Sequence, residues 1–492
     1  MSHEAGPGPA EELVEGGFAI ETADAPVLHD GLNLADLAHV LDLRSRRLLP
    51  ETAAVDLLSA LLDIDAVPAD EFPYDPRHGE TYNFRERVLV DRMGDTAGWL
   101  HAGRPRREAT RVAFRLFLRR EVSALAADVA DLGTALADQA RANAQVLFAD
   151  QTYLQQAQPS TVGHYLLVSA YPLLRDGDRL LDAVGWVNRS PGGAGCVNGS
   201  RLLDDRAPLA ELLGFDGVIT HTRDAMWQTD GLVQLLATAA SLATTQDTLA
   251  EDLEIWASAE FDLVDLDDAY TRASVLMPQK RNPYALSMVR GATGTLIGRL
   301  AGFLAVQQAP SARSDKLIFA YGEVPRAVDT TRRLTRLTRA VVSTLRWNED
   351  RMRRQLEQGF SQATDLAEVV MVTCGLDYRT AHRIVGRAVR QAAAEGRGGG
   401  ALGPELLERA AKEEIGSPLG LDPATLADAT NPASIVATRT AVGGAAREPL
   451  RAMVEDITGR AEALRLASSR RATAFARAEA RLRTEAGNVV GR

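Results

Sequence analysis

The sequence predicts an all-α protein whose subunit is built around a bundle of long helices. Three observations predict it. Apolar residues recur at alternating spacings of three and four along several long stretches, which is the period of one helix face. A length of 492 residues suffices for a large core and for two or three domains. Finally, 46% hydrophobic and 25% charged residues are typical of an ordinary globular protein.

The N-terminal part is predicted to be a leader followed by a small domain. We expect residues 1–25 to be disordered, because they combine acidic residues with proline and glycine. They lack the basic start and apolar run of a signal peptide. Residues 26–110 are predicted to form a mostly helical domain, in which Leu34 and Leu37 share one helical face. A segment with three prolines, residues 67–79, is predicted to be a loop.

Residues 111–355 are predicted to form the central bundle of long helices. Helices of about 25 to 30 residues would be roughly 40 Å long. Narrow apolar stripes of that length suit an elongated bundle, but they also suit association between subunits, and the spacing alone leaves both open. Four stripes carry the pattern: Val122, Leu125, Val129, Leu132 and Leu136; Leu232, Leu235, Leu236, Leu242, Leu249, Leu253 and Trp256; Leu296, Leu300, Phe303 and Leu304; and Leu334, Leu337, Val341 and Leu345.

Two segments interrupt the helical pattern of the bundle. Residues 188–195 are rich in glycine, which permits positive φ and close backbone approach. They are not a P-loop, since no Gly-Lys-Ser/Thr follows, and they lack the flanking strand and helix of a dinucleotide site. Residues 271–283 are predicted to form a loop, because Pro278 and Pro283 lack a backbone N–H and bias the preceding residue away from helix.

The C-terminal part is predicted to be smaller and more polar. Residues 356–470 are expected to form a small helical domain with a flexible, glycine-rich turn at 397–404. Residues 471–492, rich in arginine, alanine and glutamate, are expected to be a solvated helix or a frayed tail.

Charge and cysteine usage exclude several classes of protein. A formal net charge of −11 argues against general nucleic-acid binding and against a basic membrane-surface protein. No stretch reaches the length of apolar residues that a transmembrane helix needs. Cys196 and Cys374 match no zinc motif and are expected to be reduced, buried thiols of a cytoplasmic protein. No metal cluster or cofactor motif is found in the sequence.

The loop at 271–283 concentrates groups that can do chemistry. Ser274, Lys280 and Asn282 offer a candidate base, a cation and a hydrogen-bonding amide within nine residues. Composition alone favours a loop without a catalytic role, since serine, lysine and asparagine are ordinary loop residues. The order of the residues favours a functional one. Residues 273–283, Ala-Ser-Val-Leu-Met-Pro-Gln-Lys-Arg-Asn-Pro, closely resemble the signature loop of the fumarase/aspartase superfamily, most of all in its argininosuccinate lyase branch.

Four further motifs resemble the same family, in the same order along the chain. Together the matches span roughly residues 30 to 460. They are Leu-His-Ala-Gly-Arg-Pro-Arg at 100–106, Thr-Tyr-Leu-Gln-Gln-Ala-Gln-Pro at 152–159, Gly-Phe-Ser-Gln-Ala-Thr-Asp-Leu-Ala at 359–367 and Val-Gly-Gly-Ala at 442–445.

The resemblance implies a fold, an assembly and a reaction. It implies a three-domain, nearly all-α subunit and a homotetramer around a central helix bundle, with each active site assembled from three subunits. The implied reaction is β-elimination from a succinyl group, in which a base removes a proton beside one carboxylate, an aci-carboxylate forms, and fumarate leaves. Such a reaction needs a positioned base and donors aimed at the developing charge.

The resemblance also implies residue roles. Ser274 matches the catalytic serine of the family and is expected to be the base, with Lys280 stabilising its alkoxide or binding a carboxylate. Asn282 matches a residue that helps to hold that carboxylate. Further substrate-binding residues are expected at Thr152, Arg104, Arg106, Gln279, Arg313 and Tyr321.

The chain departs from the family at several of these positions. Tyr153 stands where argininosuccinate lyases carry a histidine linked to acid catalysis, so it is expected to be the acid, a binding group or a filler. Pro105 and Arg107 replace a serine and an asparagine that contact substrate. Ile318 and Tyr321 replace a glutamine and a lysine near the amino-acid end of argininosuccinate. Each unpaired buried polar group of that substrate would cost about 1–3 kcal/mol.

The sequence therefore favours a carbon–nitrogen lyase with an altered leaving group. We expect it to release fumarate from an N-substituted aspartate, or to add an amine to fumarate, without a metal or cofactor. Its partner would be a small dicarboxylate. Two alternatives stay open: a genuine argininosuccinate lyase, and a catalytically silent structural or binding relative, which Tyr153 favours slightly and the intact loop opposes.

Overall fold

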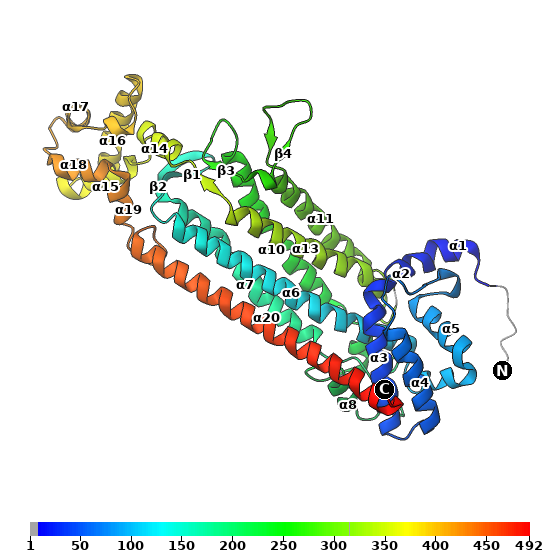
Figure 1. Cartoon of the computed structure of the whole chain (residues 1–492). Coiled ribbons are helices and arrows are strands. Elements are labelled where there is room, and N and C mark those ends of the chain that lie inside the picture. The colour runs from blue at the N-terminus through cyan, green and yellow to red at the C-terminus, as the bar shows by residue number, and fades with distance from the viewer. Residues whose placement is uncertain (1–7, 314) are drawn as a thin grey trace.

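The computed structural model of the chain describes residues 8–313 and 315–492. The molecule is elongated and almost entirely helical, with long helices in the middle and a smaller helical domain at each end (Figure 1). The strands of the described residues form three separate two-stranded antiparallel sheets. The predicted all-α fold class is confirmed.

Five long helices form the central bundle: α6 (Arg106–Ala142), α7 (Val162–Val187), α10 (Asp230–Trp256), α11 (Tyr284–Val306) and α13 (Ala320–Ser343). The stripe predicted on α6 is fully buried from end to end. The stripes on α10 and α13 also face the core, except that the last member of the α13 stripe lies just beyond the helix. Buried apolar area of this extent is the main force that holds the helices together.

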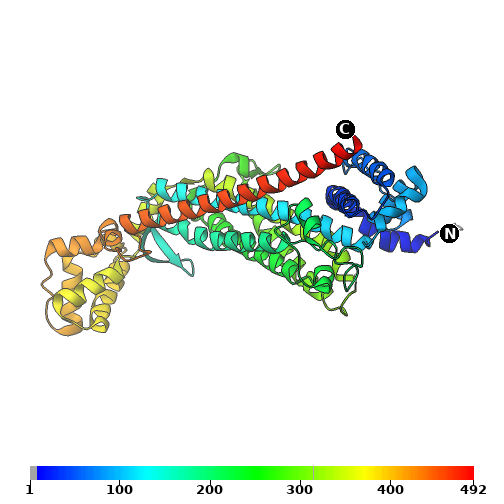
Figure 2. The same ribbon diagram turned by 90° about the horizontal axis from the view of Figure 1, so that it is seen from below.

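The last helix corrects the predicted C-terminal tail. Helix α20 (Arg447–Val490) is a single helix of 44 residues that runs back along α6 and α7 for the length of the bundle (Figures 1 and 2). Phe475 and Leu482 on its inner face are buried. The helical alternative for residues 471–492 thus agrees with the structure, whereas the boundary at residue 470 and the frayed tail do not. Most charged residues of α20 are exposed, although Glu479 is buried against Arg119 and Arg120, and a few large apolar residues pack inward.

The N-terminal domain lies at the end of the bundle where α6 begins. It contains α3 (Ala25–Ser45), α4 (Glu51–Asp65) and α5 (Thr81–Met93). Figure 1 shows α3 and α4 beside the C-terminal end of α20. A second apolar cluster, separate from that of the bundle, forms the core of this domain.

The predicted leader is helical from Glu11 onward. Helical turns α1 (Glu11–Leu13), η1 (Val14–Phe18) and α2 (Ala19–Ala23) lead directly into α3. Asp24, next along the chain, pairs with Arg326 of α13 at 2.7 Å. The prediction of disorder is therefore wrong for residues 8–25, because ion pairs tie this segment to the bundle. Its first seven residues lie outside the described part of the chain.

A small helical domain occupies the opposite end and has its own apolar core. It ends where α20 begins, at Arg447. Its helices are α14 (Glu349–Gln358), α15 (Ala363–Cys374), α16 (Tyr378–Ala394), α17 (Pro404–Ile415), α18 (Pro423–Thr430) and α19 (Pro432–Ala437).

Short elements connect these parts. Strand pairs are β1 (Leu147–Thr152) with β2 (Gln155–Thr161), β3 (Val264–Asp265) with β6 (Arg346–Trp347), and β4 (Arg272–Ala273) with β5 (Arg281–Asn282). Short helices are η2 (Pro76–His78), η3 (Gly94–His101), α8 (Ala207–Leu212), α9 (Thr222–Trp227), η4 (Asp268–Tyr270), α12 (Asp315–Ile318) and η5 (Gly399–Ala401).

Two further sequence predictions can be compared with the structure. Cys196 is exposed in the glycine-rich segment and Cys374 is half-buried, so the prediction of two buried thiols is wrong. No helix in the described residues is both long and apolar enough to cross a membrane.

Candidate active site

The loop at 271–283 is a β-hairpin that projects from the end of the bundle between η4 and α11 (Figure 1). Ser274 donates its backbone N–H to the carbonyl of Lys280 at 3.0 Å. Lys280 in turn donates its N–H to the carbonyl of Met277 at 3.0 Å, which closes a β-turn with Pro278 in its favoured second position. The hairpin therefore places Ser274 and Lys280 opposite each other.

The hydroxyl of Ser274 already sits in a stabilising environment. Its Oγ accepts the backbone N–H of Met277 at 3.0 Å. An N–H that points at an oxygen favours the negatively charged form of that oxygen. Lys280 and Gln279 are exposed on the turn. Asn282 is half-buried and donates its side-chain amide to the carbonyl of Arg272 at 3.0 Å, which secures the neck of the hairpin.

The tip of this hairpin is apolar and uncovered in the single chain. Val275 and Leu276 are almost fully exposed, and Met277 is more than one-third exposed. Large apolar side chains gathered on a projecting loop mark a surface that another element covers.

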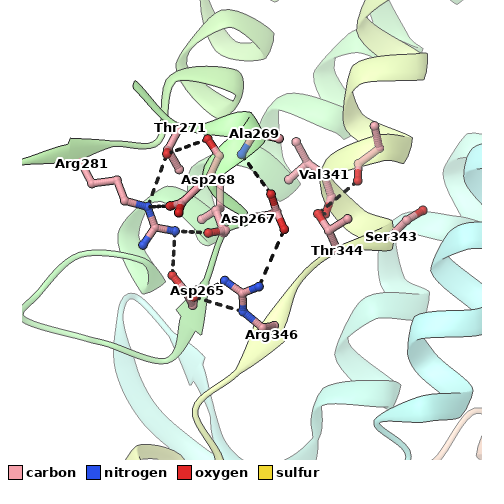
Figure 3. A network of polar contacts seen from close by, with 12 residues as sticks. Asp265, Asp267, Asp268, Ala269, Thr271, Arg281, Val341, Ser343, Thr344 and Arg346 are labelled. Atoms are coloured by element: carbon pink, nitrogen blue, oxygen red, sulfur yellow. Dashed lines mark hydrogen bonds and ion pairs between the residues drawn. The ribbon is translucent and has the colours of Figure 1, made fainter. Parts of the chain in front are cut away.

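The base of the hairpin is anchored by an ion-pair network, drawn in Figure 3. Arg281 pairs with Asp265 at 2.9 Å and with Asp268 at 2.8 Å, and it also donates to the carbonyl of Leu266. Arg346 pairs with the second oxygen of Asp265 at 2.7 Å. Partial burial acts to raise the pKa of Asp265, but hydrogen bonds from Arg346 and Arg281 hold that pKa below its usual value. The neck is thus fixed while the tip extends outward.

A second hairpin, β1–β2, carries Thr152 and Tyr153 at its turn. Tyr153 and the next residue, Leu154, both adopt positive φ values of 55° and 58°. This is the geometry of a two-residue hairpin turn that usually requires asparagine or glycine, so the residues Tyr153 and Leu154 do not predict it. Thr152 is exposed and Tyr153 is 99% exposed, so neither is committed to the core of its own chain.

Arg104 does not belong to the substrate site. It is only 4% exposed, and one terminal nitrogen donates to Asp36 at 2.6 Å and to the hydroxyl of Tyr82 at 2.9 Å. The other terminal nitrogen donates to the carbonyl of Ala35 at 3.1 Å. The assignment of Arg104 to substrate binding is therefore wrong, because its guanidinium is used to hold α3 and α5 against the start of α6.

Arg106 remains available at the surface. It is the first residue of α6, its side chain is about half exposed, and it bonds Asn83 at 2.6 Å and Glu80 at 3.2 Å. Arg107 lies further inside and pairs with Glu80 at 2.8 Å and with Glu21 of the leader at 3.5 Å. This end of α6 therefore combines several cations with two carboxylates.

Tyr321 lies inside the bundle. It is 5% exposed, and its hydroxyl accepts a hydrogen bond from Arg111. Its role in substrate binding stays a prediction. Arg313 lies on an exposed segment before α12, and Ile318 is half-buried at the end of that helix.

The candidate residues lie at opposite ends of one chain. Arg106 begins α6, and Thr152 follows the end of that helix by ten residues. A helix of 37 residues is about 55 Å long. Both hairpins lie at the end of the bundle that bears the small C-terminal domain, whereas α6 begins, at Arg106, at the end that bears α3 and α4 (Figure 1). A small substrate cannot touch both sets in one chain, so they can meet only between copies of the chain.

One buried carboxyl group near the start of α6 was missed. Glu108 is fully buried, and its two oxygens accept the backbone N–H groups of Gly193 and Gly195 at 2.6 and 2.7 Å. Both glycines have positive φ. Burial raises the pKa of Glu108 to about 7, even though the two N–H groups and Arg104 oppose that rise. Two features of the sequence could have indicated this contact. Glu108 lies in the first turn of a helix, and the glycine-rich segment offers backbone N–H groups but matches no phosphate-binding motif.

Comparisons with known proteins place this geometry among lyases. The model of a family described as Lyase matches residues 52–298, and that of a family described as Argininosuccinate lyase C-terminal matches residues 360–437. The chain is 34% identical to argininosuccinate lyase of Methanoculleus marisnigri, over 86% of this chain and 85% of that protein. It is 36% identical to argininosuccinate lyase of Natronomonas pharaonis, over 87% of this chain and 86% of that protein.

Solved structures share the whole architecture. EDDS lyase in complex with formate superposes with a TM-score of 0.88 at 25% identity, covering 99% of this chain and 97% of that one. A variant of EDDS lyase with bound fumarate gives the same TM-score. 3-Carboxy-cis,cis-muconate lactonizing enzyme from Pseudomonas putida shares the fold at a TM-score of 0.71 and 20% identity, covering 92% of this chain. The bundle and both end domains are thus common to this chain and to EDDS lyase.

Proposed function

Since this chain belongs to the fumarase/aspartase superfamily, in its argininosuccinate lyase-like branch, we propose that it is a carbon–nitrogen lyase that releases fumarate from an N-substituted aspartate whose amine differs from arginine. The reverse reaction, addition of an amine to fumarate, follows from the same chemistry. The observation that carries the proposal is the hairpin at 271–283, in which Ser274 and Lys280 are held together by their backbone.

The proposed reaction begins with removal of a proton. The alkoxide of Ser274 takes a proton from the carbon next to one carboxylate of the succinyl group, and the electron pair moves onto that carboxylate. The N–H of Met277 at 3.0 Å lowers the cost of charge on Ser274 Oγ. Lys280, exposed on the same turn, supplies positive charge to the developing aci-carboxylate when the tip is covered.

The reaction ends with cleavage of the bond to nitrogen. The electron pair returns from the aci-carboxylate to form the carbon–carbon double bond of fumarate, and the C–N electrons leave with the amine, which accepts one proton. Tyr153 is exposed on its hairpin and offers a phenolic O–H for that proton. Thr152 and Asn282 offer hydrogen bonds to the carboxylates, and Arg106 offers a planar fork of donors that fits a carboxylate.

The assembly that we propose is a homotetramer with shared active sites. Helix α11 supports it, because one of its faces is apolar and uncovered: Met288, Ile297 and Leu304 are each nearly half exposed. Glycines recur on the exposed side of α11 at 291, 294, 298 and 302, and a Cβ at any of them would meet no neighbour in the chain. Small residues on an apolar face permit close contact with helices of other subunits.

The altered leaving group is supported by the residues that would face it. Where the resemblance implies a lysine, Tyr321 is buried and accepts a hydrogen bond from Arg111. Pro105 supplies no hydroxyl at the start of α6. The likeness to EDDS lyase extends over nearly the whole chain, so the same fold is found in a lyase with a name other than argininosuccinate lyase.

The test measures fumarate by its ultraviolet absorbance. The purified chain is mixed with argininosuccinate and, separately, with other N-substituted aspartates, and in the reverse direction with fumarate and a panel of amines. We expect turnover of at least one compound with kcat/KM about tenfold or more above that for argininosuccinate. Absence of turnover with every compound, from a correctly assembled protein, would refute the proposal.

A genuine argininosuccinate lyase is the second candidate function. The relatives that share 34% and 36% identity with this chain carry that name. It would be established if argininosuccinate were turned over with a kcat/KM at least equal to that of every other compound tested.

A further inference from the structure

Arg111 is a buried cation that the proposed reaction does not use. It lies in the second turn of α6, is 4% exposed, and is enclosed by α9 and α13. Its Nε donates to the carbonyl of Met226 at 3.0 Å, and its Nη1 donates to the hydroxyl of Tyr321. The guanidinium carbon lies 5.5 Å from the ring centre of Trp227 and 5.5 Å from that of Tyr321.

Among the described residues, no carboxylate pairs with Arg111. Its Nη2 is buried and has no hydrogen-bond partner among the described residues. Burial lowers the pKa of Arg111 to about 9, and the positive charge of Arg107 acts in the same direction. Glu80 is the nearby group of opposite charge, but its oxygens pair with Arg106 and Arg107. A buried charge without a partner is unfavourable in a folded protein.

Three other buried arginines show how a carboxylate can neutralise a guanidinium inside this fold. Arg85, Arg104 and Arg119 are similarly buried and each also has a nitrogen without a partner. Each nevertheless pairs with a carboxylate, which is Asp36 for the first two and Glu479 for the third. Among these four arginines of the described chain, Arg111 is the one for which no carboxylate is found.

The position of Arg111 matches the amine half of the proposed substrate. Arg106, proposed to hold a carboxylate of the succinyl half, starts the same helix, and Arg111 lies about 7.5 Å further along the axis. Arg107 and Glu21, one turn before Arg111, are partly exposed. Arg107 lies on the same face of α6 as Arg111, one turn nearer the start of the helix, and a short substituted amine can span the rise from Arg106 to Arg111.

We propose that Arg111, together with the hydroxyl of Tyr321, binds a carboxylate at the far end of the amine that leaves from or adds to the succinyl group. The inference rests on the proposed function and narrows its substrate class to amines that carry an anionic group. Nη2 supplies the hydrogen bond, the guanidinium supplies the counter-charge, and Trp227 forms an apolar wall beside the bound group. Arg111 is thus a specificity-determining residue.

The experiment compares ω-amino acids with alkylamines of matched length. Fumarate consumption is followed with glycine against methylamine, β-alanine against ethylamine, and γ-aminobutyrate against n-propylamine. For the wild-type protein we expect kcat/KM to be about tenfold or more higher for the best ω-amino acid than for its alkylamine. In Arg111→Met that ratio should fall to about one, and in Arg111→Lys, which keeps the charge, it should recover in part.

Arg115 supplies the matched control. It is the next residue along the same face of α6 and is also buried, but it donates to the carbonyls of Trp186 and Val187 and packs its guanidinium 4.4 Å from the ring centre of Trp186. Arg115→Met should keep the preference for ω-amino acids. A wild-type protein without that preference at any length, or a preference that survives in Arg111→Met, would overturn the inference while leaving the lyase function intact.

A binding measurement separates failure of the site from failure of the reaction. The melting temperature of the wild-type protein should rise with γ-aminobutyrate concentration and respond less to n-propylamine, and Arg111→Met should lose the difference. If no amine adds to fumarate but this difference is present, the reaction fails and the anion site stands. If the melting temperatures of wild-type protein and Arg111→Met respond alike, the anion site is refuted.

Discussion

At the residue scale, a substitution of Ser274 should affect catalysis without affecting folding. Its side chain is half-buried on a projecting hairpin and contacts only the N–H of Met277 among the described hydrogen bonds. Ser274→Ala should lower kcat by about 10²–10⁴-fold, as expected for loss of a general base, with little change in KM. Fumarate release measures the effect.

The control for that variant is another serine on the surface of the bundle. The hydroxyl of Ser343 donates to the carbonyl of Arg339 on its own helix, so Ser343→Ala should retain full activity. Full activity in Ser274→Ala would remove the base assignment altogether.

Glu108 gives the residue-scale prediction on pH. Burial raises its pKa to about 7 in the folded chain, from a usual value of 4.5. As pH rises between these values the unfolded chain releases this proton first, so the contribution of Glu108 to the free energy of unfolding falls, by roughly 3 kcal/mol at most, and is constant above about pH 7. In Glu108→Gln this part of the pH dependence should disappear.

Denaturant unfolding at a series of pH values tests this prediction. At low pH, Glu108→Gln should still be less stable than the wild type by about 1–3 kcal/mol, because one of its two N–H partners would face an amide N–H. Glu405→Gln, which changes an exposed glutamate, serves as the control. An unchanged pH profile in Glu108→Gln would contradict the assignment.

At the element scale, the hairpin at 271–283 depends on its anchored neck. Arg281→Met would remove contacts to Asp265 and Asp268. We expect kcat to fall roughly tenfold, since small displacements of a catalytic group reduce rates strongly. The free energy of unfolding should change by less than about 1 kcal/mol, because these ion pairs are largely exposed.

Two variants sharpen the test of the hairpin. Arg281→Lys should regain much of kcat, since a lysine keeps the charge and one donor. Arg353→Met removes an exposed ion pair to Asp350 on α14 and should leave kcat unchanged. Equal effects of Arg281→Met and Arg353→Met would show that the network has no role in positioning.

Helix α20 gives a second element-scale prediction. Phe475 is 2% exposed against the bundle, so Phe475→Ala should lower the free energy of unfolding by about 3–5 kcal/mol. Leu466 on the same helix is 49% exposed, and Leu466→Ala should cost about 0.5 kcal/mol or less. Denaturant unfolding measures both. A decrease in the free energy of unfolding as small as that of Leu466→Ala would indicate that this part of α20 is a peripheral tail.

At the scale of the whole molecule, the separation of Ser274 from Arg106 predicts complementation between inactive variants. Ser274→Ala and Arg106→Met chains, refolded together, should regain activity, because some sites would take an intact Ser274 and an intact Arg106 from different chains. For random mixing in equal amounts, about a quarter of the sites would be intact. Activity after co-refolding, compared with each variant refolded alone, measures this.

The control for complementation is a variant that cannot assemble. Gly298→Glu places a carboxylate on the apolar face of α11, where a Cβ meets no neighbour in its own chain. It should fold, dissociate in sedimentation experiments and lose activity. If mixtures of Ser274→Ala and Arg106→Met chains assembled correctly but regained no activity, each site would have to be built within one chain.

The sequence by itself determined local features, namely which helix faces are apolar and which segments are loops. The periodicity of Val122 to Leu136 predicted a buried face of α6 correctly, because the helix period repeats every few residues and needs no knowledge of distant neighbours. The prolines and the order of residues in the hairpin at 271–283 likewise indicated both a loop and a family. The composition of the C-terminal tail misled, since alanine and arginine are compatible with a solvated helix as well as with α20.

What only the tertiary structure decided is which side chains meet. Arg104 and Arg106 are two residues apart, yet the first is enclosed by Asp36 and Tyr82 and the second faces solvent. No motif in the sequence singles out Arg111. Its lack of a carboxylate partner among the described residues can be recognised only once α6, α9 and α13 are packed together. Burial and pairing of a charge are properties of the packed chain, because they depend on residues hundreds of positions away.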